Sequence, residues 1–232
     1  MSDSPSSRFI RHTACPSCNS SDALAVYDDH EHCFSCGYDK QFKEKKEASP
    51  AARSFSPMNE IAFDMTEPHR GLDKRTWDSY GIGFKDGFIV YQYRNKDGQH
   101  VAQKIRAIEA DDDGKRLTQW RGSAKEATGF GQHLANPAKH KAIVICEGEL
   151  DAPSVYQAFG GKVAAISVPN GAQSAGKFVR DHLDEFLKFE SVVVCTDNDE
   201  PGNAAATQIM DLFEPGKVKR AVLPCKDAND TL

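Results

Sequence analysis

The sequence predicts an α/β protein in which a small cysteine-rich β module is joined by a flexible linker to a larger body with a central, mostly parallel sheet. Three observations support this fold class. Two CxxC pairs stand near the amino terminus, residues 40–57 are charged and then rich in Ala, Ser and Pro, and short β-rich runs alternate with helical stretches from residue 141 onward. Such alternation, with strands that are apolar throughout, is typical of a parallel sheet covered on both faces.

Length and composition agree with a globular protein of one large or two smaller domains. The 232 residues are 39% hydrophobic and 27% charged. No apolar run approaches the roughly 20 residues that span a bilayer, and the start, MSDSPSSRFIRH, lacks the apolar core of a signal peptide. We therefore expect no membrane segment and no export. The net charge of −5 gives no general indication of nucleic acid, although clustered carboxylates can mask a local basic groove.

The first module contains four cysteines in two pairs, Cys15 with Cys18 and Cys33 with Cys36. Two thiolates on one tight turn can face a single ion, and two such turns complete a tetrahedron. The alternative, four unrelated buried cysteines, explains the spacing poorly. Because so short a stretch could not fold on a hydrophobic core alone, zinc would supply much of its folding free energy. We expect residues 1–39 to be a zinc-binding domain with one structural Zn²⁺.

The neighbouring histidines and the other cysteines have simpler explanations than metal binding. Four thiolates saturate the ion, so we expect His30 and His32 to be surface residues. A free cysteine behaves as a small buried hydrophobe, and we expect Cys146, Cys195 and Cys225 to pack in the core.

Residues 40–57 are predicted to be a flexible linker, because such a composition buries little apolar surface. The first part of the body, residues 58–140, then contains two alternating runs on either side of the tripeptide KDG at 96–98. This pattern predicts a β-hairpin.

The last part, residues 141–232, carries the alternation of strands and helices. The runs AIVIC, VAAISV, SVVVC and KVKRAVLP predict four strands. Between the second and the third strand, the stretch GKFVRDHLDEFLKF predicts a helix with one apolar face, made of Val179, Leu183, Phe186 and Leu187.

Two of the predicted strands end in carboxylates, Glu147 on one and Asp197 with Asp199 on the other. Ligands gather at the carboxyl ends of parallel strands, and alternate residues of an extended segment point the same way. Converging carboxylates repel one another unless a cation neutralises them, and oxygen ligands favour Mg²⁺ or Mn²⁺. The sequence therefore predicts a divalent-metal site of the kind used in phosphoryl transfer.

Helix capping is an alternative explanation for several of these acids. Glu149 and Asp151 precede a predicted helix that begins near Pro153, and Asp199 and Glu200 precede another. Acids at a helix amino terminus interact favourably with the helix dipole. For Glu149, Asp151 and Glu200, capping explains the sequence as well as metal binding does.

Together these motifs resemble the Toprim domain of primases, topoisomerases and some nucleases. The EGxxD element reads EGELD at 147–151, and the DxD element reads DND at 197–199. The match extends from about residue 13 to the end. It includes the cysteine module, which resembles a zinc ribbon and is called the ribbon below, the linker, GFGQHL at 129–134 and VLPCKDAND. Over this length the chain resembles the primase half of bacteriophage primase-helicases of the T7 type.

The resemblance implies a Toprim-containing RNA polymerase domain, with residues 58–140 as its amino-terminal subdomain and 141–232 as its Toprim subdomain. It implies a DNA primase, which joins ribonucleoside triphosphates into short RNA primers on a single-stranded DNA template. The ribbon would read a short template sequence. Glu147, Asp197 and Asp199 would hold two Mg²⁺ ions, or Mn²⁺ in their place. The candidate further ligands, direct or through water, are Glu149, Asp151, Asp227 and Asp230.

Cations between the hairpin and the Toprim part would hold template and nucleotide phosphates. Lys104 and Arg106 alternate on the second hairpin strand, in a QKIR element that resembles the family's basic motif facing the active site. They are therefore expected to be catalytic residues. The other candidates for nucleotide or nucleic-acid binding are Trp120, which could stack on a base, Arg121 and Lys177. We expect three further cations to form a solvated surface: Lys115, Arg116 and Lys125.

The resemblance also suggests partners and a location. No GxxxxGK[ST] motif occurs, so a replicative helicase would be fused in a full-length relative or act in trans. Whether the chain is an excised domain or a standalone relative stays open. A DNA polymerase would be a further partner, and the protein would work in the cytoplasm of an infected bacterial host.

Two rival functions use similar parts. A recombination-mediator protein also joins a four-cysteine zinc site to a Toprim fold, as a DNA-binding module without polymerisation. A Toprim nuclease is the second rival. The intact acids and the basic hairpin argue against the first, and the amino-terminal ribbon argues against the second.

Overall fold

The computed structural model describes residues 8–41 and 69–232. The chain divides into two compact units, Met1–Phe55 and Ser56–Leu232. Most of the predicted linker, residues 42–57, lies outside the described residues. Within the described ranges, no helix combines the length and the apolarity that a membrane crossing requires.

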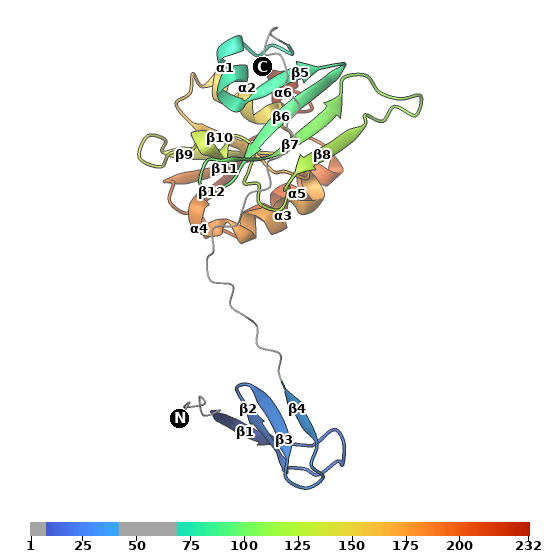
Figure 1. Ribbon diagram of the computed structural model, residues 1–232. Helices are drawn as coiled ribbons and strands as arrows, with labels where there is room; N and C mark the ends of the chain where they lie inside the picture. The colour runs from blue at the N-terminus through green and yellow to red at the C-terminus, as the bar shows by residue number, and fades with distance from the viewer. Residues whose placement is uncertain (1–7, 42–68) are drawn as a thin grey trace, which may run out of the picture. The chain divides into compact units, whose positions relative to one another are not determined.

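The amino-terminal unit is a small antiparallel sheet with strand order β1-β2-β3-β4. Its strands are β1 (Phe9–Thr13), β2 (Leu24–Tyr27), β3 (His30–Cys33) and β4 (Asp39–Gln41) (Figure 1). The last strand therefore continues two residues beyond the predicted boundary at 39. The buried apolar cluster of this unit consists of Cys15, Leu24 and Cys33. So small a core cannot offset the entropy of ordering the chain, which agrees with a fold that depends on its cysteines.

The described part of the second unit has first a short helix and then an antiparallel sheet of order β5-β6-β7-β8. The elements are α1 (Lys74–Tyr80), β5 (Ile82–Lys85), β6 (Phe88–Arg94), β7 (His100–Ala107) and β8 (Thr118–Gly122). Strands β6 and β7 form the predicted hairpin, with Tyr91 opposite Lys104 and Ile89 opposite Arg106. The hairpin prediction is confirmed.

The predicted parallel sheet is also confirmed. Its order is β10-β9-β11-β12, and every neighbouring pair runs parallel. The strands are β9 (Ala142–Cys146), β10 (Ala164–Ser167), β11 (Ser191–Cys195) and β12 (Val218–Arg220). The helices are η1 (Gln132–Leu134), α2 (Asp151–Ala158), α3 (Ala172–Asp181), α4 (Leu183–Phe186), α5 (Glu200–Met210) and α6 (Ala228–Thr231).

Both faces of the parallel sheet are covered, as its continuously apolar strands require. Ile143 and Ile145 pack with residues of α3, α4 and α5 in one buried cluster (Figure 1). Val144 and Cys146, which point the opposite way, belong to a second cluster that includes residues of α1, α2 and the antiparallel sheet. This second cluster joins the two sheets into one body, so the basic hairpin has a fixed place beside the parallel strands.

Two details differ from the sequence prediction. The expected single helix is broken at His182, where φ is −120° and ψ is 18°, so α3 and α4 are separate. After the break the apolar face shifts: Leu187 is exposed, and Phe189 is buried in its place. Cys225 is also exposed, because it lies in the irregular segment after the short strand β12. Cys146 and Cys195 are buried, as predicted.

Candidate active site

The site is built where two neighbouring parallel strands end in register. Cys146, the last residue of β9, is the partner of Cys195, the last residue of β11. Glu147 follows the first strand directly, and Asp197 follows the second after one residue. Because both strands run the same way, both acids leave the same edge of the sheet.

Glu147 is half-buried at this edge. Its Oε2 is shielded from solvent and accepts no hydrogen bond from the part of the chain that the structure describes. Burial raises the pKa of Glu147, and the charge of Asp199 raises it further, against the lowering effect of the Asp197 amide. A buried acceptor without a donor is costly, and a bound cation would remove that cost.

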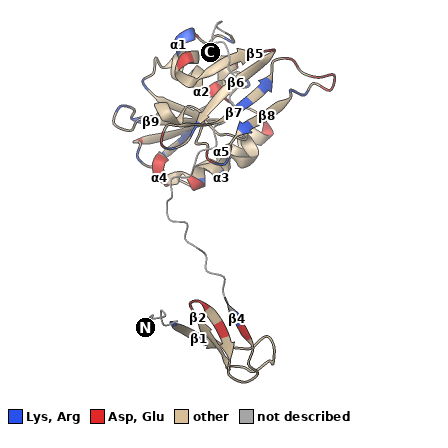
Figure 2. Ribbon diagram, viewed as in Figure 1, with Lys and Arg blue, Asp and Glu red and all other residues tan. Residues whose placement is uncertain are grey.

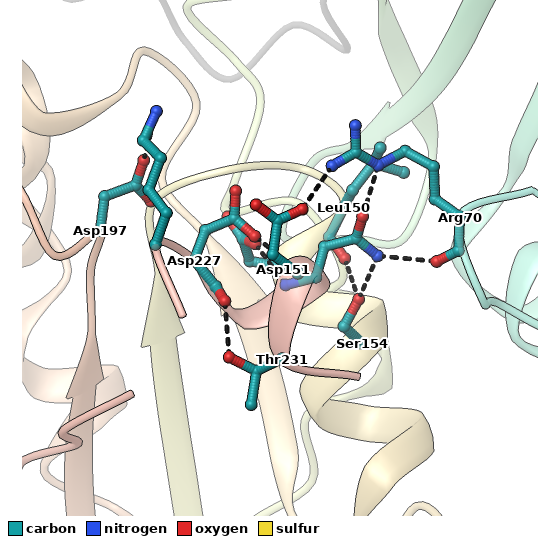
Figure 3. Close-up of polar contacts among 10 residues, drawn as sticks. Arg70, Leu150, Asp151, Ser154, Asp197, Asp227 and Thr231 are labelled. Carbon is teal, nitrogen blue, oxygen red and sulfur yellow. Dashed lines mark hydrogen bonds and ion pairs between the residues drawn. The ribbon is translucent and has the colours of Figure 1, made fainter. Parts of the chain in front are cut away.

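Asp197 stands among other carboxylates. Burial, and then the charges of Glu147, Asp227 and Asp199, raise its pKa to about 6. Among the described residues, Lys226 opposes them, with its Nζ 4.0 Å from Asp197 Oδ2 (Figure 3). Burial and the neighbouring carboxylates together outweigh the effect of the nearby cation on this pKa, and a bound divalent metal would favour the charged form of Asp197.

Asp199 caps the helix that follows. It is the N-cap of α5, and its Oδ1 accepts a 2.9 Å hydrogen bond from the Gly202 amide. Thr196 Oγ1 donates to the Gly202 carbonyl at 2.8 Å, which ties the first turn of α5 to the end of β11. The capping explanation is therefore correct for Asp199, although the same residue lies close enough to influence the pKa of Asp197. Glu200 is exposed in the first helical turn, where its charge favourably meets the helix dipole.

Asp151 is buried and braces the turn after β9. Its Oδ2 accepts a hydrogen bond from the backbone N–H of Gly148, and its Oδ1 accepts one from the backbone N–H of Asn229, each at 3.0 Å. A Cβ on residue 148 would lie 2.5 Å from Asp151 Oδ2, so the glycine of the EGxxD element permits this approach. Burial, with the charges of Asp227 and Asp197, raises the pKa of Asp151 to about 7. The N-cap of its own helix is Leu150, which makes no side-chain capping bond.

The carboxyl-terminal segment completes this side of the site, where Asp227 lies beside Asp151 (Figure 3). Asp227 is the N-cap of α6 and accepts from the Asp230 amide at 2.7 Å. Asp230 turns away, to an ion pair with Arg70 at 3.0 Å. The structure therefore brings Asp227, but not Asp230, toward the other acids.

Two asparagines that the sequence analysis did not single out hold this arrangement. Asn198 Nδ2 donates to the carbonyls of Leu223 and Cys225, at 2.8 and 2.7 Å. Asn229 Nδ2 donates to the carbonyl of Arg70 and to Ser154 Oγ, each at 2.9 Å. Asn198 could have been noticed in the sequence, because it lies inside the DND element. No local pattern indicated that Asn229 would bond to Arg70, which is 159 residues away.

Figure 2 shows basic positions along β7, and the pleat of the strand decides which face each side chain occupies. Lys104 and Arg106 share one face, and Trp120 lies opposite Lys104 on β8, with its ring centroid 5.6 Å from Nζ. Arg121 lies opposite Gln103 and so occupies the other face, where it is exposed. The structure therefore does not group Arg121 with Lys104.

Two other predicted residues are held in ion pairs, Glu149 with Lys104 of this face and Lys177 with Asp181. Glu149 is buried and accepts from Lys104 Nζ at 2.5 Å, so it is neither a helix cap nor an open carboxylate. Lys177 pairs with Asp181 one turn along α3, also at 2.5 Å. The three cations expected on the solvated surface are exposed: Lys115, Arg116 and Lys125.

The four cysteines of the ribbon form a second site. The ligand atoms of Cys15, Cys18, Cys33 and Cys36 lie within 4.8 Å of one another. Two sulfur pairs are 3.7 and 3.8 Å apart. Zn–S bonds of about 2.3 Å in a tetrahedron place sulfurs roughly 3.8 Å apart, so the cluster fits one zinc ion.

The two histidines near the cluster have other partners. His30 Nδ1 lies 2.7 Å from Asp29, and His32 Nδ1 lies 3.3 Å from Asp39. Both rings are half-buried rather than fully exposed. Across residues 8–41 and 69–232, the cysteines form the one group with three or more ligand atoms within 4.8 Å, so the carboxylates of the active site are spaced more widely.

Comparison with known proteins finds relatives of one kind. A family model described as Toprim-like matches residues 144–232. The DNA helicase/primase of Enterobacteria phage T3 is 32% identical over 241 residues, which cover 96% of this chain and 41% of that protein. This chain thus spans about two-fifths of that relative's length.

Solved structures give the same result. The primase fragment of the bacteriophage T7 primase-helicase protein is 32% identical, with a TM-score of 0.60, over 95% of this chain and 93% of that one. A second structure shows bacteriophage T7 lagging-strand DNA polymerase interacting with primase domains of two subunits, which are bound to an RNA/DNA hybrid and dTTP. The matching chain of that structure is 36% identical, with a TM-score of 0.58, and the match covers 69% of this chain and 80% of that one. The chain therefore belongs to the primase part of the T7-type bacteriophage primase-helicases, with a Toprim domain and a four-cysteine zinc site.

Proposed function

We propose that this protein synthesises short RNA primers on single-stranded DNA, starting from ribonucleoside triphosphates. In each step a 3′-hydroxyl attacks the α-phosphate of the incoming nucleotide. The new O–P bond forms as the bond between the α- and β-phosphates breaks, and pyrophosphate leaves. The observation that carries the proposal is the buried Oε2 of Glu147, which has no partner among the described residues and lies beside Asp197, whose pKa is raised by burial and then by the surrounding carboxylates.

The residues at this edge fit divalent magnesium. Glu147 and Asp197 would hold it, with Asp199 contributing the carboxylate oxygen that does not cap α5. Two ions would complete their shells with water and substrate phosphates, as Mg²⁺ usually does in proteins. When bound, the ions supply charge stabilisation to the attacking and leaving oxygens. Asp227 would accept hydrogen bonds from water at the rim of this site.

The protein's own cations bind the substrate. Lys104 and Arg106 share the face of β7 that belongs to the second buried cluster, where Lys104 reaches the turn after β9. Their charges would hold the triphosphate and the template backbone. The partly buried Trp120, beneath the Lys104 ammonium, is part of this platform rather than a free stacking surface.

The zinc unit would select where synthesis starts. It is a separate compact unit, so it can bring a template sequence to the active site without being part of it. The relatives suggest two further partners. The helicase named with the T3 protein would unwind the duplex, and a DNA polymerase like that in the T7 complex would receive the primer.

One assay separates this function from its rivals. Protein is incubated with single-stranded DNA of random sequence, labelled ribonucleotides and Mg²⁺, and the products are resolved by length. A primase yields short labelled RNA, a Toprim nuclease shortens the DNA, and a recombination-mediator module only retains it. DNA cleavage or retention without labelled RNA would overturn the proposal.

A further inference from the structure

A buried ion pair links the basic hairpin to the acidic edge. Lys104 Nζ on β7 lies 2.5 Å from Glu149 Oε1, in the turn after β9, and the two side chains are only 13% and 5% exposed. The Tyr93 hydroxyl donates to the same oxygen at 2.6 Å. Burial and the Glu149 carboxylate raise the pKa of Tyr93 well above its ordinary value, so the hydroxyl remains a donor.

Glu149 therefore differs from the other acids of the EGxxD element. Glu147 presents a buried oxygen that has no partner within residues 8–41 and 69–232, whereas Glu149 is matched by an ammonium and by a hydroxyl. A buried carboxylate that already has a cation at hydrogen-bond distance gains little from a metal, and the ammonium would repel one. The geometry thus separates two glutamates that are two residues apart in the sequence.

The same contacts fix the direction of Lys104. Its ammonium has three N–H donors. One goes to Glu149, and a second goes to the Pro169 carbonyl at 3.0 Å, in the loop after β10. The Trp120 ring lies 5.6 Å away and supports the cation from the side. The lysine is thereby held against two turns that both follow parallel strands, at the edge where Glu147 also lies.

We propose that Glu149 is a positioning residue, which binds no metal and holds the Lys104 ammonium so that its third donor meets the triphosphate of the incoming ribonucleotide. This inference rests on the proposed function for the identity of the substrate. Glu149 acts through Lys104, so its removal has consequences only while the lysine is present.

A double-mutant cycle in the full chain tests this inference. The variants are Glu149→Gln, Lys104→Met and the pair, and the main readout is the dissociation constant of Mg²⁺–ATP. Each single variant is expected to weaken nucleotide binding roughly tenfold, because each removes a charge-assisted contact. The pair is expected to bind no more weakly than Lys104→Met alone.

Magnesium affinity is the second readout. When the protein is titrated with Mg²⁺ in the absence of nucleotide, the Mg²⁺ concentration at half-saturation should be the same for Glu149→Gln and wild type. A higher concentration at half-saturation, or losses of nucleotide affinity that multiply in the pair, would mean that Glu149 is a metal ligand, and the inference would be wrong.

Two further variants control for folding. Tyr93→Phe removes a hydrogen bond to the same carboxylate oxygen but leaves the ion pair, so ATP affinity should stay near that of wild type. Equal losses for Tyr93→Phe and Glu149→Gln would show that any disturbance of this buried cluster suffices, which overturns the positioning role. If Glu149→Gln does not fold, Glu149→Asp keeps the charge but shortens the reach, and the same cycle applies to it.

The readout also keeps this inference separate from the proposed function. ATP and Mg²⁺ binding do not depend on primer synthesis. A wild type that binds ATP with the expected non-additive cycle, yet makes no RNA, would contradict the proposed function and support the positioning role. If wild type makes RNA but the effects of the two substitutions on ATP binding are additive, the proposed function is supported and the positioning role is contradicted.

Discussion

The amide end of helix α5 lies against the backbone of Asp197, so closely that a Cβ on Gly202 would be 2.2 Å from the Asp197 carbonyl oxygen. No real side chain tolerates such a contact with backbone. The glycine therefore sets the distance between the acidic strand end and the helix that Asp199 caps.

Gly202→Ala should displace Asp197 and Asp199. The added methyl group must push α5 away from β11, at a cost of about 1–3 kcal/mol in the free energy of unfolding. Nucleotide joining should fall by more than the loss of folded protein explains. Gly176→Ala is the comparison, because the atoms nearest to its Cβ belong to the side chain of Gln208, at 2.9 Å or more, whereas those nearest to a Cβ on Gly202 are backbone atoms at 2.2 to 3.0 Å; a helical Gly→Ala exchange also gains propensity. Equal effects of the two substitutions would show that the close approach is unimportant.

Stability should depend on pH and on magnesium together. In the folded protein the pKa is about 6 for Asp197 and about 7 for Asp151, against an ordinary value of 3.8. The folded state therefore holds these protons more tightly than the unfolded chain does. Their contribution to stability is full below pH 3.8 and is lost as the pH rises through 6 and 7.

Magnesium should reverse that loss, since it binds the deprotonated carboxylates. Thermal unfolding without added Mg²⁺ should show a lower Tm at about pH 8 than at about pH 6, and Mg²⁺ should raise Tm more at the higher pH. Asp197→Asn should reduce both effects. A magnesium shift that is the same at the two pH values would contradict the assignment of these acids.

Loss of one thiolate should unfold the ribbon alone. The buried cluster of that unit contains three residues, two of which are cysteines, so Cys36→Ser should release zinc and melt β1 to β4. Hydrogen exchange should rise there and remain unchanged in β9 and β11, which belong to the other unit. If metal analysis finds no zinc in the purified wild-type protein, the explanation of this fold by a bound metal is wrong.

Removal of residues 1–57 should separate initiation from chemistry. The truncated protein keeps Glu147, Asp197, Asp199, Lys104 and Arg106, so it should still extend a pre-formed primer. It should lose initiation from nucleotides alone, because the template-reading unit is gone. Equal losses in initiation and extension, measured on one template, would instead mean that the ribbon only stabilises the body.

Local patterns allowed much of the fold to be predicted. Continuous apolar runs marked β9 and β11, and parallel strands must end together, which placed Glu147 and Asp197 at one edge. The hairpin and the cysteine cluster were equally local, because a short loop and a fixed spacing define them.

Contacts between distant segments could not be predicted in the same way. Glu149 and Lys104 are 45 residues apart, and only the packing of the two sheets makes them partners. Arg121 seemed to belong with Lys104 by proximity in sequence, but cross-strand register decides its face. The break at His182 moved Leu187 to the surface, which a continuous helical period could not anticipate.

Synthesis of labelled RNA by wild type and Asp197→Asn, on the same single-stranded template with Mg²⁺, tests the central claim most directly. Asn keeps the size of the side chain and removes the charge that would bind the metal. The account predicts short RNA from wild type and none from the variant, at equal zinc content and with a Tm no lower. Wild-type rates of nucleotide joining by Asp197→Asn would contradict the assignment of the active site.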